Sequence, residues 1–178
     1  MKNVFTTRRL CRAAVIAALY VALTYAFAPF AFGPFQIRPA EALCILAVIY
    51  PEAIPALCVG CACANLASPY FAYDITFGTL ATLLGALGSY TVGRFVKPKA
   101  WKIVLGGFFP VLFNALIVPF TIVFLCGLTD GYASPAAAYF FIAASIAFTE
   151  FVWIYALGTP LYVLVARLRE KNVRMVMD

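Results

Sequence analysis

Histidine is absent from this chain, and its absence excludes several common catalytic sites. A Ser–His–Asp triad and a zinc protease site both need an imidazole, as a base or as a metal ligand. A glycine-rich phosphate-binding loop is also missing, so we do not expect the chain to hydrolyse ATP itself. We therefore expect no enzyme, no metal and no cofactor, and any energy for transport would come from a partner or an ion gradient.

Charged residues are scarce. They make up 11% of the 178 residues, whereas hydrophobic residues make up 65%. An average soluble domain has roughly 25% charged and 45–50% apolar residues, because its surface must stay dissolved. The apolar surplus must face lipid here, so we predict one all-α integral membrane domain over residues 1–178.

The basic residues are confined to three short stretches. These hold twelve of the thirteen Lys and Arg residues and form no continuous basic face, which argues against a nucleic-acid partner. Short loops rich in Lys and Arg stay in the cytoplasm, so we expect both termini inside and an even number of crossings between successive stretches. The stretches are Lys2, Arg8, Arg9 and Arg12; Arg94, Lys97, Lys99 and Lys102; and Arg167, Arg169, Lys171 and Arg174.

Long apolar segments predict the membrane helices, since a crossing needs about 20 apolar residues for about 30 Å of hydrocarbon. Pro51 and Pro55 interrupt the interval between the first two clear segments. As an α-helix, the first half of that interval would be only about 18 Å long. The first two basic stretches are both expected inside, so an even number of crossings must lie between the first two clear segments. We therefore expect two crossings there, joined by an inward-facing turn at Pro51, and predict a six-transmembrane-helix bundle. The predicted helices are roughly 10–27, 39–50, 52–68, 75–93, 103–126 and 136–165.

Small residues recur at every fourth position on two of these helices. Such stripes let helix backbones approach closely in lipid, where no hydrophobic force drives association. On helix 75–93 we expect the stripe to serve internal packing. On helix 10–27 two interpretations stay open, internal packing or a face offered to another subunit. The stripes are Ala14, Ala18, Ala22 and Ala26 with Ala13 and Ala17 beside them, and Ala81, Gly85, Ser89 and Gly93.

Cys58, Cys61 and Cys63 lie in the run PALCVGCACANLA, whose CxxC and CxC spacings also occur in redox and zinc sites. Such sites need thiolates, and usually a polar or cationic neighbour that favours the thiolate. The run supplies no such neighbour. We therefore interpret the three cysteines as small residues that pack between helices.

Two polar residues lie near the middle of predicted membrane helices, where polar groups are costly and therefore functional by default. They are Glu150, in SIAFTEFVWIY, and Asn114, in PVLFNALIVP, at similar depths. One interpretation is an interhelical hydrogen bond that only joins the helices. The other is a pocket wall, in which Glu150 accepts hydrogen bonds from ligand N–H groups and Trp153, one turn on, stacks on a flat ligand.

Four further polar residues lie at the predicted outer ends of the helices. Arg38 and Glu41 open the short second helix, where Glu41 would cap the helix or pair with Arg38. Asn65 closes the third helix, and Asp74 suits the N-cap of the fourth. Each has a simple structural role alone. Because all four converge on the outer rim of a bundle with polar groups deeper inside, we hypothesise one shared binding pocket.

The block QIRPAEALCILAVIYPEAIPALCVGCACANL, followed by YDITFGTLATLLGAL, resembles the QueT family of queuosine-precursor transporters. The resemblance covers nearly the whole chain and is most specific over residues 36–52. It implies a substrate-binding S component of an energy-coupling factor (ECF) importer, which is a six-helix bundle in the bacterial cytoplasmic membrane. Such S components bind a micronutrient from outside and work with a transmembrane T component and two cytoplasmic ATPases.

The resemblance also implies a ligand, a 7-deazaguanine base such as 7-aminomethyl-7-deazaguanine or queuine. Of Glu150 and a second acid, either Asp74 or Glu41, one would accept hydrogen bonds from the ring N–H groups and the other would bind the aminomethyl cation. Asn65 and Asn114 would meet the carbonyl and ring nitrogens, and the aromatic residues would sandwich the ring plane. Arg38 and Trp153 stay members of the hypothesised pocket. The implied docking face for the T component is Ala14 and Ala18, or Ala13 and Ala17.

Two alternatives stay open on the sequence alone. One is an S component for another flat heteroaromatic vitamin, such as a flavin, thiamine or folate. The other is a stand-alone membrane protein, either a small carrier or a structural subunit without a ligand. In each case the chain contacts the lipid bilayer, and no nucleic-acid partner is expected.

Overall fold

The computed structural model describes residues 6–32 and 36–171, and the regular structure of this part is helical, with no strand. Four of its helices are long and apolar enough to cross a membrane. The all-α membrane class is therefore supported, whereas the six crossings and the side of the termini stay predictions. The long helices are α1 (Thr7–Ala26), Phe71–Phe95, Lys99–Leu125 and Pro135–Glu170, and two shorter apolar helices are η1 (Pro39–Val48) and α3 (Ala53–Asn65).

Each of the last three long helices contains a five-residue π-helical segment, which we did not predict. Such wider turns are often found at functional sites. Here the first contains Asp74, and the third begins four residues after Glu150. The elements are α4 (Phe71–Tyr73), η2 (Asp74–Gly78) and α5 (Thr79–Phe95); α6 (Lys99–Phe120) and η3 (Thr121–Leu125); and α7 (Pro135–Trp153), η4 (Ile154–Gly158) and α8 (Thr159–Glu170).

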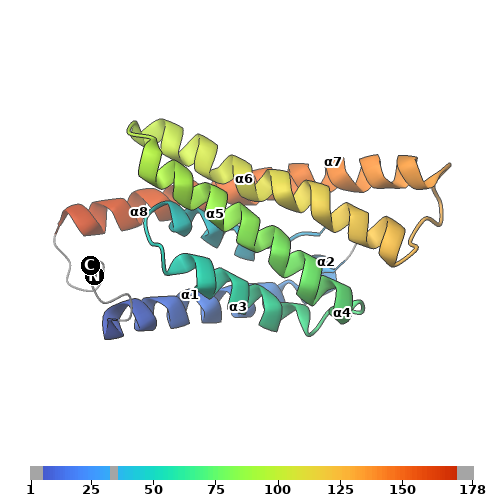
Figure 1. Cartoon of the computed structure of the whole chain (residues 1–178), viewed down its shortest axis with the longest axis horizontal. Helices are drawn as coiled ribbons and strands as arrows, with labels where there is room; N and C mark the ends of the chain where they lie inside the picture. Colours follow the sequence, from blue (N-terminus) through green and yellow to red (C-terminus); the bar gives the residue numbers. More distant parts are fainter. Residues whose placement is uncertain (1–5, 33–35, 172–178) are drawn as a thin grey trace.

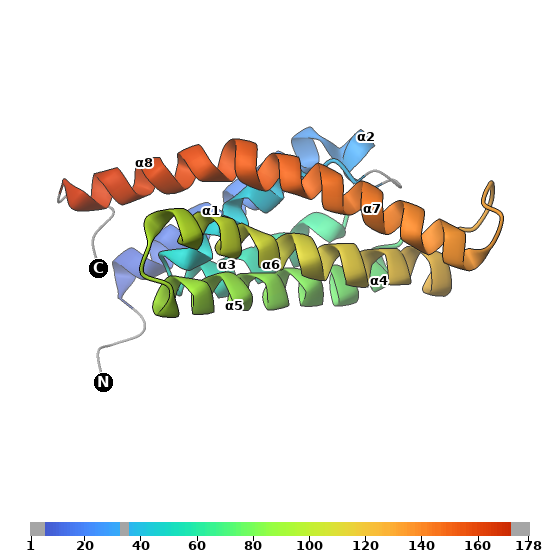
Figure 2. The same cartoon turned by 90° about the horizontal axis from the view of Figure 1, so that it is seen from above.

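The helices lie side by side along the long axis of the molecule, so the bundle has two ends (Figure 1). At one end, on the left in Figure 1, α1 begins, α5 turns into α6 and α8 finishes. Toward the opposite end lie α4, the short helix α2 (Ala28–Ala31) and the start of α7. α7, η4 and α8 continue as one long helix across the bundle (Figure 2). The first of these ends is the basic end, which carries Arg9, Arg94, Lys102 and Arg169.

The short second helix, η1, is a 3₁₀ helix, and our prediction of an α-helix over 39–50 is wrong in that respect. All ten of its residues are buried, and it contacts α1, α3, α5, α6, α7, η4 and α8. A 3₁₀ helix rises about 2.0 Å per residue against about 1.5 Å in an α-helix. Packing on every side outweighs the poorer hydrogen-bond geometry that normally limits such helices. The short segment therefore reaches further through the bundle than an α-helix would.

Small residues bring α5 against η1 and α6. A Cβ added at Gly93 would lie 2.1 Å from the carbonyl oxygen of Val48, and one added at Gly85 would lie 2.8 Å from the Cα of Pro110. Ser89 of the same stripe is fully buried. Because no larger side chain fits between these backbones, the stripe on α5 serves internal packing, as we predicted.

The alanines of α1 divide between two faces. Ala13 and Ala17 are half-buried and pack on the core of the bundle. The approach to α3 is close, since a Cβ added at Gly60 would lie 3.1 Å from the carbonyl oxygen of Ala17. α1 therefore packs on α3 with this stripe and leaves the other stripe at the surface. The members of the exposed stripe are Ala14, Ala18, Ala22 and Ala26.

Candidate functional site

Six of the seven predicted site residues are buried together in the interior of the bundle. Electrostatic interactions join Arg38 to Glu41 and Asp74. Glu150 interacts with Glu41 and Asn114 in turn. Together these residues and Asn65 are the buried polar cluster, with exposed fractions of 1% for Glu41 and Asn65, 3% for Asn114, 4% for Glu150, 5% for Arg38 and 8% for Asp74.

Glu41 is hydrogen-bonded through both carboxylate oxygens. The Tyr20 hydroxyl of α1 donates to Oε1, and the Cys44 thiol donates to Oε2 over 3.2 Å. Glu41 lies in the first turn of η1, as we predicted, but within the described residues it forms no capping hydrogen bond and no ion pair with Arg38. Sequence reasoning missed Tyr20 and Cys44. The signal for Tyr20 is its spacing of four from Thr24, because both lie on the buried face of α1.

Asn65 and Asp74 join the end of α3 to η2. The Asn65 amide donates to the backbone oxygen of Asp74 over 2.7 Å and to the Cys61 sulfur over 3.4 Å. The Ser68 hydroxyl donates to Asp74 Oδ2. Gly78 leaves room for this contact, because a Cβ there would lie 2.9 Å from Asn65 Nδ2. Asp74 therefore lies inside its helix, and the prediction that it caps that helix is wrong.

Three buried atoms of the cluster have no hydrogen-bond partner among the described residues. They are Asn65 Oδ1, Asn114 Nδ2 and Glu150 Oε2. Asn114 and Glu150 approach closely enough to interact, but a simple clasp between α6 and α7 leaves these two atoms unsatisfied. An unsatisfied buried polar group costs about 1–3 kcal/mol, and native proteins keep few of them. The three atoms are therefore the places where a bound ligand would gain most.

The cluster contains more acid than base. Arg38 donates from Nε to the Ala31 oxygen over 2.9 Å and lies over the Phe32 ring, 5.2 Å from its centroid. In the part of the chain that the structure describes, Arg38 forms no ion pair. Three carboxyl groups of the cluster surround this one positive charge, and buried carboxylates without a counter-charge are costly. A cationic group would complete the site.

A pocket of about 390 Å³ opens at the end opposite the basic end. Asp74 lines it, together with three aromatic side chains. Glu150 lies eight residues deeper along α7 than the lining residue Ile142, which is roughly 12 Å at the α-helical rise. Asn114 likewise lies eight residues deeper along its helix than the lining residue Ile122. The pocket therefore reaches Asp74, whereas Glu150 and Asn114 lie deeper in the bundle.

Trp153, the seventh predicted site residue, is half-buried at the end of α7. It packs edge-on against Phe27, with ring centroids 6.2 Å apart. The structure therefore shows Trp153 in an aromatic contact with the segment that follows α1, and its stacking role stays a prediction. The aromatic residues that line the pocket beside Asp74 are Phe32, Tyr70 and Tyr132, together with the buried Gln36.

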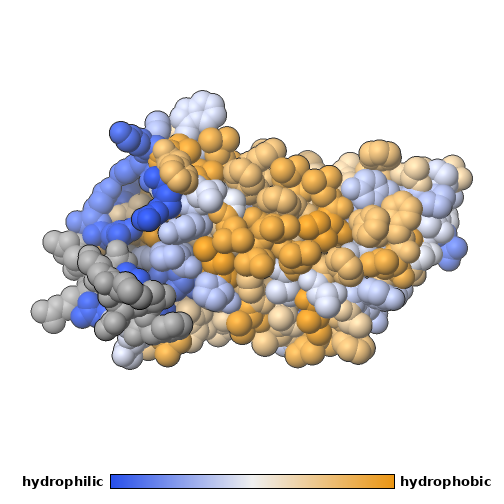
Figure 3. Space-filling view, in the orientation of Figure 1, coloured by the Kyte–Doolittle hydropathy of each residue, from blue (hydrophilic) through white to orange (hydrophobic). Residues whose placement is uncertain are grey.

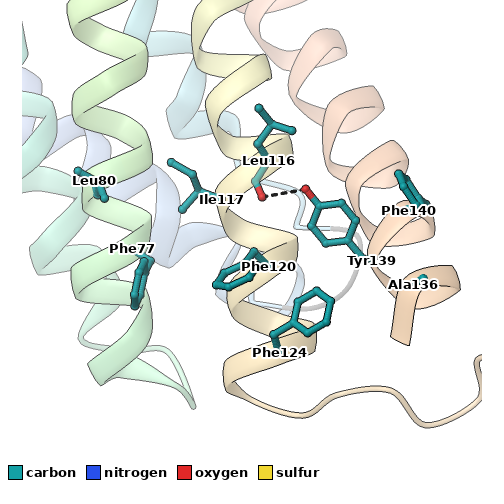
Figure 4. A pocket seen from close by; sticks show the side chains of 9 residues that line it. All are labelled: Phe77, Leu80, Leu116, Ile117, Phe120, Phe124, Ala136, Tyr139 and Phe140. Atoms are coloured by element: carbon teal, nitrogen blue, oxygen red, sulfur yellow. Dashed lines mark hydrogen bonds between the residues drawn. The ribbon is translucent and has the colours of Figure 1, made fainter. Parts of the chain in front are cut away.

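A second hollow, of about 520 Å³, lies between α5, α6 and α7 (Figure 4). Aromatic and aliphatic side chains line it. The hydrogen bond drawn there joins the Tyr139 hydroxyl to the Leu116 oxygen over 3.2 Å. With that hydroxyl already bonded, the lining offers little that would orient a polar ligand. The buried polar cluster is therefore the better candidate for a specific site.

The model of a family described as the QueT transporter matches residues 10–167 of the chain. The match includes every member of the buried polar cluster and all the long helices except their outermost residues. No curated protein and no solved structure matches the chain.

Proposed function

Because the chain belongs to the QueT transporter family, we propose that it is the substrate-binding S component of an ECF importer for a queuosine precursor. Family membership and the long apolar helices make it a multi-pass membrane transporter of a small molecule. The proposal adds the substrate class, the partners and the bacterial cytoplasmic membrane. The proposed ligand is a 7-deazaguanine base such as 7-aminomethyl-7-deazaguanine or queuine.

The observation that carries this proposal is the set of three unsatisfied buried atoms. Glu150 Oε2 and Asn65 Oδ1 are acceptors, and Asn114 Nδ2 is a donor. A 7-deazaguanine ring presents neighbouring N–H donors and a carbonyl acceptor, so it can satisfy both kinds of atom at once. The flat ring also suits helices that are otherwise lined by apolar side chains.

Charge supports the same ligand class. One arginine and three carboxyl groups lie in the buried polar cluster, and the aminomethyl substituent would bring a second positive charge. A hydrogen bond between an ammonium and a carboxylate is about twice as strong as a neutral one. We propose that Glu150 meets the ring N–H groups and that Asp74, at the mouth of the cluster, meets the aminomethyl group. Glu41 is less available because Tyr20 and Cys44 already donate to it.

The two ends of the bundle support the proposed direction of uptake. Lys and Arg gather at the basic end, which the positive-inside rule assigns to the cytoplasm. The pocket beside Asp74 opens at the other end and would then face outward. A ligand entering from outside would meet Asp74 first and would reach Glu150 only after the helices above it separate.

The proposed partners are a transmembrane T component and two cytoplasmic ATPases, because the sequence has no phosphate-binding loop of its own. We propose that the T component docks on the exposed stripe of α1, through Ala14 and Ala18. Ala13 and Ala17 are half-buried against the core and would flank this contact. Small exposed residues would allow a partner helix to approach closely.

The test is calorimetric titration of the purified chain with matched ligands. We expect 7-aminomethyl-7-deazaguanine to bind and its neutral 7-cyano analogue to bind about tenfold more weakly, because the analogue lacks the cation. Riboflavin, thiamine and folate serve as the comparison set for a different vitamin. Binding of one of these, without binding of any deazaguanine, would overturn the substrate. Uptake into liposomes by this chain alone would overturn the partners.

A further inference from the structure

A polar hollow of about 690 Å³ lies at the basic end, at the opposite end of the bundle from the pocket beside Asp74. The ends of α1, η1, α5, α6 and α8 surround it. Its one acidic group is already paired, since Glu170 Oε1 lies 2.6 Å from Lys99 Nζ. The wall is therefore strongly positive. The charged residues in it are Arg9, Arg94, Lys102, Arg169 and Glu170.

The positive-inside rule explains why Lys and Arg gather at this end, but it does not explain why they surround one hollow. Lys97 and Arg167 would satisfy the rule equally well, and both are exposed outside the wall of the hollow. Figure 3 shows strongly hydrophilic residues gathered at this end of the molecule, next to a broad hydrophobic band. The hollow therefore lies where a membrane protein passes from lipid tails to lipid headgroups.

Two of the basic side chains contact α5. Lys102 Nζ donates to the Gly93 oxygen over 3.0 Å at the end of α5, and an ammonium has two further N–H donors. The Arg94 guanidinium lies over the Tyr90 ring, 5.8 Å from its centroid. These contacts fix the charges at the wall of the hollow and lower the entropy lost when an anion binds.

The lining of the hollow is amphipathic. Beside the basic residues it includes apolar side chains from η1 and α8. A free inorganic anion would use only the basic part, whereas an amphipathic anion would use both parts. The apolar lining residues include Val48, Ile49, Pro51 and Ala166, with the ring of the buried Tyr162.

We propose that this hollow binds the phosphate group of an anionic phospholipid. Arg94 and Lys102 hold the phosphate oxygens, with a guanidinium fork and an ammonium point charge. The apolar lining contacts the glycerol and the first carbons of the acyl chains. Basic pockets between membrane helices bind acidic lipid headgroups in this way. The site is separate from the buried polar cluster and does not depend on the proposed substrate.

The experiment is native mass spectrometry of the full chain in nonionic detergent, titrated with phosphatidylglycerol, phosphatidylcholine or inorganic phosphate. We expect one tightly held phosphatidylglycerol, with phosphatidylcholine at least fivefold weaker and inorganic phosphate unable to displace the lipid. Each basic residue near a membrane surface contributes about a fivefold change in binding. The double variant Arg94→Gln/Lys102→Gln should therefore bind phosphatidylglycerol about 25-fold more weakly.

The matched control is Lys97→Gln/Arg167→Gln, which removes the same charge from outside the hollow. This control should keep the affinity for phosphatidylglycerol within about twofold, since neither side chain lines the hollow. Equal losses in the two double variants would overturn the proposal, because the lipid would then respond to general surface charge. Equal binding of both lipids, or displacement of phosphatidylglycerol by inorganic phosphate, would overturn it as well.

Discussion

Glu150 and Glu52 are both largely buried, but only Glu52 forms an ion pair among the described residues. Glu52, in the turn between η1 and α3, forms an ion pair with Arg12 of α1, in which Arg12 Nη2 lies 2.6 Å from Glu52 Oε1. The side chains of Arg12 and Glu52 are 12% and 10% exposed. The Arg12 guanidinium also lies 4.3 Å from the centroid of the Tyr50 ring. Glu150 Oε2 has no partner in the described part of the chain. A neighbouring helix supplies a counter-charge to Glu52, whereas no described residue lies within ion-pair distance of Glu150.

The largest effect is expected from breaking the pair at the basic end. Glu52→Gln should lower the free energy of unfolding by about 3 kcal/mol, because the ion pair between Glu52 and Arg12 would be lost in a mostly buried place. Ligand affinity should stay unchanged. Unfolding measured in detergent, in a double-mutant cycle with Arg12→Gln, gives the interaction energy. Additive effects of the two substitutions would show that the pair contributes nothing.

The reverse pattern is expected at Glu150. Glu150→Gln should weaken binding of 7-aminomethyl-7-deazaguanine about 100-fold, because a hydrogen bond to a charged group is worth about 1.5–3 kcal/mol. The empty protein should be as stable as the wild type or more so, since a costly buried carboxyl group is removed. Calorimetric titration and thermal unfolding measure the two quantities, with Glu52→Gln as the matched control. Unchanged affinity would defeat the assignment of Glu150.

The comparison also depends on α1, which carries both Arg12 and Tyr20. Ala17→Leu should lower the free energy of unfolding by about 2 kcal/mol, because the larger side chain would be forced against α3 beside Gly60. Ala14→Leu, on the exposed stripe, should change it by less than about 0.5 kcal/mol. Unfolding of both variants in detergent tests this order. If Ala14→Leu were the more destabilising, the division of α1 into two faces would be wrong.

At Asn114 we expect a smaller effect, in which a substitution stabilises the empty protein but weakens ligand binding. Asn114→Leu removes an unsatisfied buried donor, so the empty protein should gain about 1 kcal/mol in unfolding free energy. The same variant should bind the deazaguanine about tenfold more weakly, because the ligand carbonyl loses its donor. Thermal unfolding without and with ligand measures both. A loss of stability in the empty protein would show that Asn114 mainly joins the helices.

Much of the bundle follows from one-dimensional patterns. The four long helices appear where apolar runs predict them, with ends displaced by a few residues. The last helix continues past residue 165 to Glu170, because its final turn is rich in residues that favour helices. The form of η1 and the three π-helical segments were not predictable in this way. They depend on how neighbouring helices press on each backbone, which hydropathy does not record.

The members of the buried polar cluster were predictable from the sequence, but their hydrogen-bond partners were not. Glu150, Asn114 and Asn65 draw attention because polar groups are rare in an apolar chain. Tyr20, Cys44 and Ser68 look unremarkable in the sequence, yet they donate hydrogen bonds inside the cluster. Which face of a helix points inward decides such contacts, and that face is set by packing between helices far apart in the chain.

The amino-acid sequence by itself determined that this chain is an α-helical membrane protein with one basic end, because apolar runs and clustered charges act through lipid and through the membrane surface. Only the tertiary structure decided which buried groups are satisfied. Tyr20 of α1 donates a hydrogen bond to Glu41, whereas Glu150, Asn114 and Asn65 each keep an atom without a hydrogen-bond partner among the described residues. Hydrogen bonds need atoms within about 3 Å in the right direction, and only the packed bundle sets those distances.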